Sequence, residues 1–353
     1  MGMLGDTLRS LNGPVLITGH TGFKGTWLSI LFESLEIPVV GFSLPALSDS
    51  LYIRAERLGK IPEFFGDITS IETVEEVFNK FNPSCIIHLA AESLVLTSYK
   101  KPIDTFNVNV MGTANILEMA TRLPSVRISA CITSDKVYEN LGKSKAFNEN
   151  DKIGGLDPYS ASKSAAESVI TAWRNLSSER NGSKVISFRA GNVIGGGDLG
   201  KNRLMPDIIR NIYYSQDLVI RNLNSTRPWQ HVLDPLSGYI MGIEHSLNFS
   251  SNEVFSLNFG PNEPSKSVGE ILQIAEGFFG VNHLRYSVKN SAEKEEVSLS
   301  LDSSKANLEI GWKPKFNQEI AVLKTLEWWE KNLKSDLNAN ALCREDIHNF
   351  LDL

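Results

Sequence analysis

The fold is decided near the start of the chain by the stretch Val15-Leu16-Ile17-Thr18-Gly19-His20-Thr21-Gly22-Phe23-Lys24-Gly25. Its first residues are apolar or β-branched and predict a short buried strand, and an apolar pattern with helical spacing follows the last glycine. The glycines are spaced GxxGxxG, which allows a tight turn, a close approach of the backbone to a diphosphate, and close packing of helix on strand. The stretch therefore predicts a dinucleotide-binding turn. A purely structural turn is the alternative from the glycines alone.

The first half of the chain repeats this alternation of short strand and longer helix. Strands are expected at residues 15–18, 39–42, 85–90, 128–133 and 184–189, and helices at 27–35, 71–81, 108–120 and 160–176. Alternating elements of this kind pair their strands in parallel through right-handed crossovers. We therefore predict an α/β fold, with a Rossmann-like doubly wound parallel sheet and a smaller mixed α/β substrate-binding lobe.

The alternation ends after Arg189, where the glycine-dense segment 191–200 begins. We expect a dinucleotide-binding Rossmann domain over residues 1–188, joined by a returning strand near 254–259. Residues 189–353 should form mainly the substrate-binding lobe, interleaved with that domain. A helix is expected at 318–333, and the polar tail 335–353 is compatible with either an interaction helix or a loosely ordered end.

Composition excludes several classes of protein. The chain has 353 residues, 42% of them hydrophobic, and a formal net charge of -6, so no global field attracts nucleic acid. Its three cysteines form no CxxC pair, which argues against a metal site and fits a reducing cytoplasm. No apolar run approaches the roughly 18 residues that span a bilayer, and no signal peptide is recognisable. A cytoplasmic protein without nucleic-acid or membrane partners is expected.

A second motif, Tyr159-Ser160-Ala161-Ser162-Lys163, stands at the start of a predicted helix. The YxxxK spacing places phenol and ammonium on one helix face. We expect the charge of Lys163 to lower the pKa of Tyr159 toward a value useful for a general base. Ser134, at the end of the preceding strand, could hydrogen-bond the same substrate oxygen. An isolated YxxxK match would more often be an exposed pair with no joint role, but this one accompanies Ser134 and the glycine turn.

The position that usually recognises the cofactor ribose is unusual. In an NAD site an acidic residue lies about 20 residues beyond the glycine turn. Here that position reads Gly41-Phe42-Ser43-Leu44-Pro45, which contains neither an acid nor an arginine for a 2′-phosphate. These residues leave the choice between NAD and NADP open, and the missing arginine favours NAD.

The order of glycine turn, Ser134 and YxxxK resembles the extended short-chain dehydrogenases, and longer strings make the chain similar to the CDP-glucose 4,6-dehydratases. These strings are GHTGFKG at 19–25, TSDKVYEN at 133–140, DPYS at 157–160, RAGNVIGGGD at 189–198 and RPWQHV at 227–232. The resemblance covers most of residues 14–330. Related sugar-nucleotide dehydratases carry an acidic residue where this chain has Lys136, and that lysine looks like a feature of the CDP-glucose group.

The resemblance implies an NAD-dependent lyase that converts CDP-glucose to CDP-4-keto-6-deoxyglucose. Tyr159, tuned by Lys163 and assisted by Ser134, would deprotonate the C4 hydroxyl while hydride passes to the nicotinamide. Lys136 would then remove the C5 proton while Asp135 protonates the departing C6 hydroxyl, and the hydride would return to C6. A simple salt bridge at a strand end is the alternative for Asp135 and Lys136.

The same resemblance implies the binding residues and a homodimer formed through helices at 101–122 and 157–178. Asp67-Ile68 would contact adenine, although Asp67 is equally well explained as a cap or turn residue. Arg227 beside Trp229 is the first choice for a substrate diphosphate contact. The alternative for Arg203, Arg221 and Arg227 is that they are ordinary solvated or core-edge arginines. The cofactor residues are Gly19, Thr21, Gly22, Phe23, Lys24, Gly25, Asp67, Ile68, Ala90, Tyr159 and Lys163, and the substrate residues are Asn192, Arg203, Arg221 and Arg227.

Some alternatives stay open. Segment 92–99 differs from the more basic run of the CDP-glucose group, so the preference for base and sugar is less fixed than the reaction type. A dehydratase of another nucleotide sugar, a 4-epimerase, and a non-catalytic dinucleotide sensor are the rival readings. His88, inside an apolar strand, is expected to be a satisfied core histidine.

Overall fold

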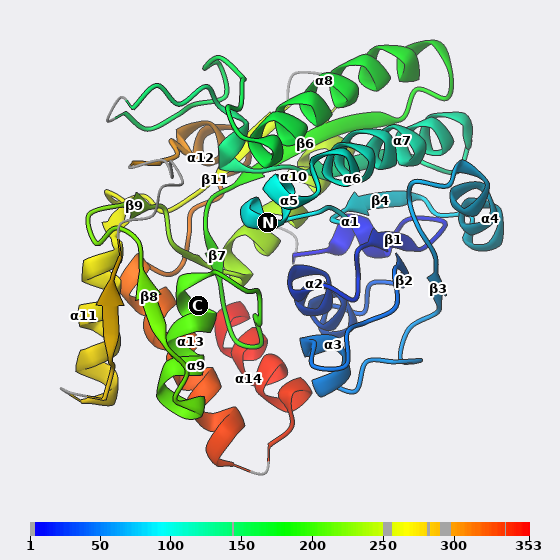
Figure 1. Cartoon of the computed structure of the whole chain (residues 1–353). Helices are drawn as coiled ribbons and strands as arrows, with labels where there is room; N and C mark the ends of the chain where they lie inside the picture. The colour runs from blue at the N-terminus through cyan, green and yellow to red at the C-terminus, as the bar shows by residue number, and fades with distance from the viewer. Residues whose placement is uncertain (1–3, 143–144, 250–255, 281–282, 290–297, 336) are drawn as a thin grey trace.

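A seven-stranded parallel sheet forms the centre of the protein, which we describe from a computed structural model at residues 4–142, 145–249, 256–280, 283–289, 298–335 and 337–353. The strand order is β11-β6-β5-β4-β1-β2-β3 (Figure 1). The central strands consist of buried, mostly apolar residues, as expected where helices cover both faces of a sheet. The strands are β1 Val15–Thr18, β2 Val39–Ser43, β3 Glu63–Phe65, β4 Cys85–His88, β5 Ile128–Ile132, β6 Lys184–Ala190 and β11 Ser256–Phe259.

Strand β1 pairs with β2 on one side and with β4 on the other. The strand order therefore reverses between β1 and β4. Open α/β sheets bind their ligands at such a switch point. The glycine turn after β1 lies at this edge.

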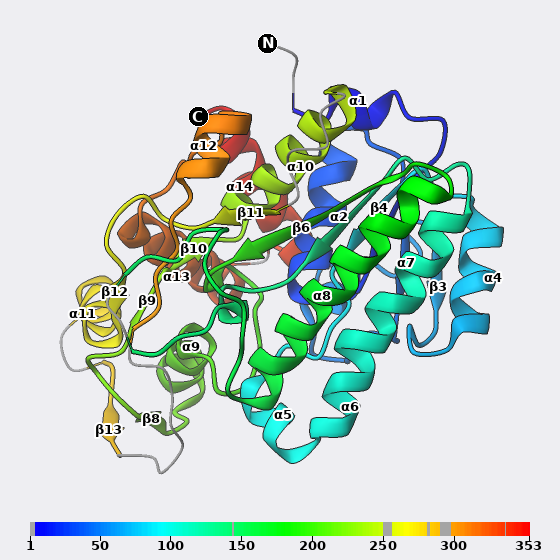
Figure 2. The same ribbon diagram turned by 90° about the horizontal axis from the view of Figure 1, so that it is seen from above.

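Helices cover both faces of the sheet. One face carries α4 (Ile71–Phe81), α7 (Thr113–Arg122) and α8 (Pro158–Glu179), with α6 (Pro102–Phe106) and a π-helical segment η1 (Asn107–Gly112) leading into α7 (Figure 2). The other face carries α2 (Phe23–Ser34) and α10 (Leu233–Asn248). Short helix α1 (Asp6–Arg9) precedes β1, and the short helices α3 (Leu51–Arg54) and α5 (Val95–Lys100) lie in connections.

The later part of the chain adds a second group of elements beside the carboxyl edge of the sheet (Figure 1). Two-residue strands β7 (Val193–Ile194) and β10 (Gln230–His231) pair in parallel, and β9 (Thr226–Arg227) pairs with β12 (Lys266–Ser267). Strand β8 (Leu218–Ile220) pairs with β13 (Tyr286–Val288). The helices are α9 (Leu204–Tyr214), α11 (Val268–Phe279), α12 (Ser304–Ile310), α13 (Gln318–Lys334) and α14 (Ala339–Leu351).

The predicted α/β fold is confirmed, and the expected strands agree with the structure to within two residues at each described end. The expected helix at 108–120 is only partly right, because α7 begins at Thr113 and η1 precedes it. Residues 254 and 255 of the expected returning strand lie outside the described residues, and β11 begins at Ser256.

The carboxyl-terminal tail is a packed helix rather than a loose end. Helix α14 buries Leu342, Cys343, Ile347 and Phe350 in the same apolar core as α2. Among the residues described, no helix is both long enough and apolar enough to cross a membrane.

Candidate active site

The glycine turn has the geometry that its spacing predicts. Gly19 has a φ of +72°, where a side chain would be strained. A Cβ atom on Gly25 would lie 2.2 Å from the Gly19 carbonyl oxygen, so only glycine lets α2 start this close to the turn. The Thr21 hydroxyl donates to the Leu44 carbonyl at 3.1 Å and lies 2.8 Å from the Ser43 hydroxyl, which ties the turn to the end of β2.

Polar groups near the expected ribose position are already engaged with one another. Glu63, on the neighbouring β3, accepts a 2.6 Å hydrogen bond from the Tyr52 hydroxyl and lies 3.1 Å from His20 Nε2. The Asp67 carboxylate accepts from the Thr69 amide at 2.8 Å, as in a turn. The end of β2 therefore offers the Ser43 hydroxyl, while the Glu63 carboxylate on β3 is engaged by Tyr52 and His20.

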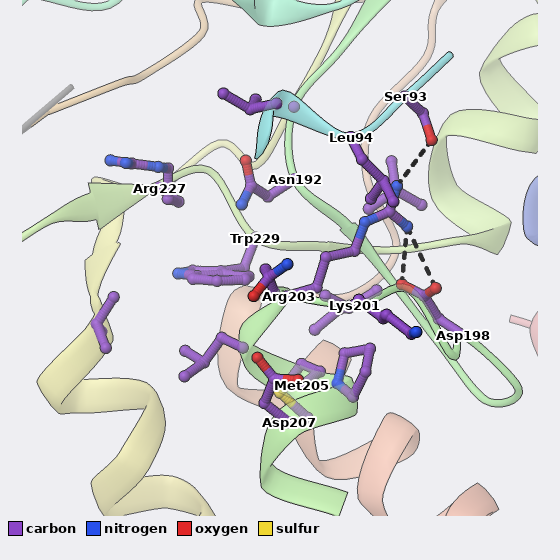
Figure 3. Close-up of a pocket in the computed structure, with 18 of the residues that line it drawn as sticks. Ser93, Leu94, Asn192, Asp198, Lys201, Arg203, Met205, Asp207, Arg227 and Trp229 are labelled. Atoms are coloured by element: carbon purple, nitrogen blue, oxygen red, sulfur yellow. Dashed lines mark hydrogen bonds and ion pairs between the residues drawn. The ribbon is translucent and has the colours of Figure 1, made fainter. Parts of the chain in front are cut away.

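A cavity of about 310 Å³ lies between the end of the sheet and the later elements (Figure 3). Residues from the parallel-sheet part of the chain and from the later elements both line its walls. A site that holds a cofactor beside a substrate needs walls of this kind. Of the residues singled out from the sequence, it is lined by Phe23, Lys24, Ser134, Asp135, Lys136, Tyr159, Asn192, Arg203, Arg221 and Arg227. Gly19, Thr21, Gly22, Gly25, Asp67, Ile68, Ala90 and Lys163 are not among its lining residues.

The structure brings Ser134 and Tyr159 together at the floor of this cavity. Tyr159 is in the first turn of α8, which Asp157 caps by accepting from the Tyr159 and Ser160 amides at 3.0 Å. Ser134 ends β5 and caps the 3-10 turn η2 (Asp135–Val137). Its hydroxyl donates to Asp135 at 2.9 Å and hydrogen-bonds the Tyr159 phenol.

The expected effect of Lys163 on Tyr159 is not found in the protein alone. Burial raises the pKa of Tyr159 to about 12, and the Ser134 hydrogen bond lowers it only partly. Burial also lowers the pKa of Lys163 to about 8, and its Nζ is 3.5 Å from the Ile132 carbonyl oxygen. The expectation failed because desolvation of the phenolate outweighs the lowering effects of the Ser134 hydrogen bond and the Arg203 charge.

A buried ion pair fixes α8 to the sheet. Glu167 lies one turn beyond Lys163 on α8 and receives two hydrogen bonds from the Arg189 guanidinium, at 3.0 and 2.9 Å. It also accepts from Thr133 at 2.6 Å and from Ser187 at 2.9 Å. Because Thr133 directly precedes Ser134, this carboxylate sets the position of Ser134 relative to α8.

Two further buried polar residues order the neighbourhood. The Asn109 side chain accepts from the Glu92 amide at 2.9 Å and donates to Ser162 at 2.9 Å, so η1 joins the loop after β4 to α8. His88 hydrogen-bonds Thr18 and Thr113, and burial lowers its pKa to about 3. The interpretation of His88 as a satisfied core histidine is confirmed.

The arginines singled out from the sequence have different surroundings. Arg203 forms an ion pair with Asp198 at 3.0 Å and donates to Ser93 at 3.2 Å, so it joins the loop after β7 to the loop after β4 across the cavity (Figure 3). Arg227 lies on the opposite side of Asn192 and Trp229 from Arg203 in Figure 3. Its guanidinium donates to the Thr226 carbonyl oxygen. Arg221 also lines the wall, as does Asp207. Burial raises the pKa of Asp207, and the charges of Arg210 and Arg221 oppose that rise.

Sequence reasoning missed several of these residues. Glu167 carries a detectable signal, because it lies four residues after Lys163 and eight after Tyr159 on one helix face. Ser93 has no such signal, since its contact with Arg203 joins parts of the chain 110 residues apart. Segment 93–96 does line the cavity, as expected for the loop in which this chain departs from the CDP-glucose group. The described residues contain no group of three or more potential metal ligands.

Comparison with known proteins is consistent with these features. Residues 16–325 match the protein family described as GDP-mannose 4,6 dehydratase. The chain is 39% identical over 321 residues to the CDP-glucose 4,6-dehydratase of Salmonella typhimurium, covering 89% of each chain. It is 28% identical to the dTDP-glucose 4,6-dehydratase of Haemophilus influenzae, covering 91% of this chain and 99% of the other.

Solved structures share the fold. A UDP-glucose 4-epimerase from Thermotoga maritima superimposes with a TM-score of 0.79 at 20% identity, covering 91% of this chain and all of the other. A dTDP-glucose 4,6-dehydratase from Streptomyces venezuelae, solved with NAD, also gives a TM-score of 0.79 at 20% identity, covering 90% and 97%. Dehydratases and epimerases therefore share this architecture, and the fold alone does not separate them.

The Glu167–Arg189 pair yields a prediction about stability. We expect Glu167→Gln to destabilise the protein by about 3 to 5 kcal/mol at neutral pH, because Arg189 is left as an uncompensated buried cation. The double variant Glu167→Met with Arg189→Met should recover most of that loss. Urea unfolding measures both, and a single-variant loss below about 1 kcal/mol would contradict the assignment.

The pH dependence of that loss has a definite sign. Burial alone would raise the pKa of Glu167, but the hydrogen bonds and charge of Arg189 lower it. The stabilisation is therefore complete above the ordinary glutamate range and is lost as the pH falls through the lowered value. The difference between the natural protein and Glu167→Gln should shrink in acid, and a difference that grows there would contradict the account.

Proposed function

The chain belongs to the GDP-mannose 4,6-dehydratase family, and from this premise we propose that it is a lyase that converts CDP-glucose to CDP-4-keto-6-deoxyglucose with bound NAD. The observation that carries the proposal is the joint placement of Tyr159, Ser134, Asp135 and Lys136 around one cavity next to the glycine turn. The 39% identity to a CDP-glucose 4,6-dehydratase supports this choice of substrate.

The residues around the turn fit a dinucleotide. A Cβ on Gly19 would lie 2.8 Å from the Ala90 amide nitrogen, so turn and strand end form a close cradle of backbone groups. The amino terminus of α2 points its free amides at the same edge, where a diphosphate is favoured. Bound NAD would accept a hydride from C4 of the sugar and return it to C6.

Each proton transfer can be given to a residue on the cavity wall. Tyr159 would remove the C4 hydroxyl proton, with Ser134 hydrogen-bonding the same oxygen. Since the pKa of Tyr159 is about 12 in the protein alone, we propose that bound ligand and Lys163 together must favour the phenolate. Lys136 would take the C5 proton, and Asp135 would protonate the leaving C6 hydroxyl.

Product analysis tests the proposal. Incubation with CDP-glucose and a catalytic amount of NAD should yield a 4-keto-6-deoxy sugar without net NADH, because the hydride is returned in each turnover. UDP-glucose, dTDP-glucose and GDP-mannose, assayed in parallel, test the base and sugar preference. A 4-epimer as the product, or no reaction with any of them, would contradict the proposal.

The variant Lys136→Ala separates dehydratase from epimerase chemistry. We expect it to retain oxidation at C4 and lose elimination, with turnover reduced by about 10² to 10⁴-fold, since this is the usual contribution of a general base. Single-turnover absorbance at the NADH wavelength and mass spectrometry of the sugar measure the two steps. Lys136→Arg serves as the matched control for charge. Normal dehydration by Lys136→Ala would remove this lysine from the mechanism.

We also propose a homodimer that pairs the side of the molecule carrying α6, η1 and α8. Apolar side chains are exposed there, with Ile103 80% and Met111 52% accessible. Ile103→Glu should convert the dimer to a monomer, because a charge would be buried in the interface. Sedimentation equilibrium measures the mass, and a single-chain mass for the natural protein would contradict the proposal.

We further propose a cellular location and a division of the chain into two domains. The protein would act in the cytoplasm, which fits its few cysteines and a nucleotide-sugar substrate. The two domains would be residues 1–188 and 189–353. Residues of the second range line one wall of the cavity, and β11 from this range pairs with β6 in the sheet.

A further inference from the structure

The cavity extends beyond Tyr159 to an end that is formed by α9 and β8, which pack against each other. Arg203 is one of the charges that affect the pKa of Tyr159, and it forms an ion pair with Asp198. Asp198 is in turn one of the charges that affect the pKa of Asp207, in the first turn of α9. A hexose held at Tyr159 therefore leaves the end between α9 and β8 for the nucleoside of the substrate.

This end has the apolar wall that a flat ring needs. The side chains of Met205, Leu218 and Ile220 line it and are buried. Ser225, in the segment after β8, also lines the cavity and is only 3% exposed. Its hydroxyl has no hydrogen-bond partner among the described residues. Because buried hydroxyl groups are normally hydrogen-bonded, we expect a ligand to supply the partner of Ser225.

Asp207 places a carboxylate on the same wall. Its Oδ1 accepts a 2.7 Å hydrogen bond from Arg210 on the same helix. Among the described residues, no hydrogen bond reaches its other oxygen, Oδ2. The side chain is half-buried and lines the cavity below Trp229 in Figure 3. An ionised carboxylate accepts hydrogen bonds and donates none, so the wall presents one acceptor to a ligand that enters here.

We propose that Oδ2 of Asp207 accepts a hydrogen bond from the exocyclic amino group of cytosine and thereby selects CDP-sugars over UDP-sugars and dTDP-sugars. The inference rests on the proposed function, because it assumes that a nucleotide sugar occupies the cavity. Cytosine carries an amino donor at C4, where uracil and thymine carry a carbonyl acceptor. The carboxylate binds the first group and repels the second, and a bound uracil would also leave the acid desolvated without a donor.

The Ser225 hydroxyl has a different part in the same site. Cytosine and uracil share the carbonyl at C2, and both nucleotides share the ribose. A hydrogen bond from Ser225 to one of these shared groups adds affinity for either nucleotide and no preference between them. Ser225 therefore provides an internal comparison for Asp207.

Binding of CDP and UDP measures the preference without turnover. Isothermal titration calorimetry of the natural protein with saturating NAD should give a dissociation constant for CDP that is about 10 to 100-fold lower than for UDP, the range that one base contact provides. Asp207→Asn should bring the two constants close to each other, because an amide offers either a donor or an acceptor to position 4. The ratio of kcat/KM for CDP-glucose and UDP-glucose should fall by the same factor.

Two variants serve as controls, each checked for folding by circular dichroism. Arg210→Gln is the matched control, because it removes the ion pair of Asp207 and keeps the carboxylate. It should retain the natural ratio of the two dissociation constants within a few-fold. Ser225→Ala should weaken CDP and UDP equally and leave that ratio unchanged.

A ligand variant tests the same contact in the natural protein, so the result does not depend on the folding of Asp207→Asn. An analogue of CDP with hydrogen in place of the amino group lacks the donor and keeps every other atom of the base. It should bind about 10-fold or more weakly than CDP. Equal affinity for CDP and this analogue would overturn the contact.

The remaining outcomes separate this inference from the proposed function. If the natural protein binds neither nucleotide and converts no nucleotide sugar, the proposed function fails. If it converts CDP-glucose but Asp207→Asn keeps the natural ratio, or Arg210→Gln loses the ratio to the same extent as Asp207→Asn, only the role of Asp207 is overturned. A ratio that changes in Ser225→Ala alone would assign base recognition to Ser225 and would likewise overturn it.

Discussion

The geometry of the candidate site depends on the buried contact between α8 and the carboxyl ends of β5 and β6. Glu167 receives hydrogen bonds from Thr133, Ser187 and Arg189, so one carboxylate connects the helix that carries Tyr159 and Lys163 with both strands. Arg189 continues the network through the Tyr138 hydroxyl to Asn258 on β11. A buried pair of this kind adds little net stability when it is satisfied, but it is costly to break. Its contribution here is to restrict α8 to one position relative to Ser134.

Burial explains the shifted pKa values of the phenol and the two lysines at the site. Tyr159 is held neutral, and Lys163 and Lys24 have lowered pKa values, all for the same first cause, which is loss of water. A dinucleotide and a nucleotide sugar each bring a diphosphate, and the cavity offers Lys24 near the turn and Arg221 and Arg227 on the far wall. We interpret the crowding of cations as preparation for two anionic ligands.

Local patterns made the scaffold predictable. The strand before the glycine turn and the helix at 71–81 have the predicted bounds, because each is encoded by neighbouring residues. Ser134 and Tyr159 were also predicted to meet, since parallel strands and their following helices bring such residues to one edge. The π-helical turn at Asn107–Gly112 was not predicted. Its sequence keeps a helical period, and the Asn109 side chain makes contacts to Glu92 and Ser162 that only the tertiary structure supplies.

Tertiary packing explains three features that the sequence did not predict: the pKa of Tyr159, the packing of the tail and the contact of Arg203. The pKa of Tyr159 was predicted in the wrong direction, since the YxxxK spacing reveals the neighbouring charge but not the depth of burial. The sequence of the tail was ambiguous because polar residues outnumber its apolar ones. Only the packing of α14 against α2 shows that Leu342 and Phe350 are core residues. Arg203 was predicted in the cavity, but its bond to Ser93 joins two loops with no shared pattern.

The 3-10 turn after β5 accounts for how one bound sugar can meet two sets of proton-transfer groups. Ser134, Asp135 and Lys136 are consecutive, and a 3-10 turn rises only about 2 Å per residue. Ser134 is the cap of this turn, and Asp135 and Lys136 are its first two residues. In the proposed mechanism Ser134 serves C4 while Asp135 and Lys136 serve C6 and C5, and these carbons are neighbours in the hexose. An epimerase must turn its sugar between two hydride transfers, whereas this arrangement lets a dehydratase complete both transfers with the sugar held in one place.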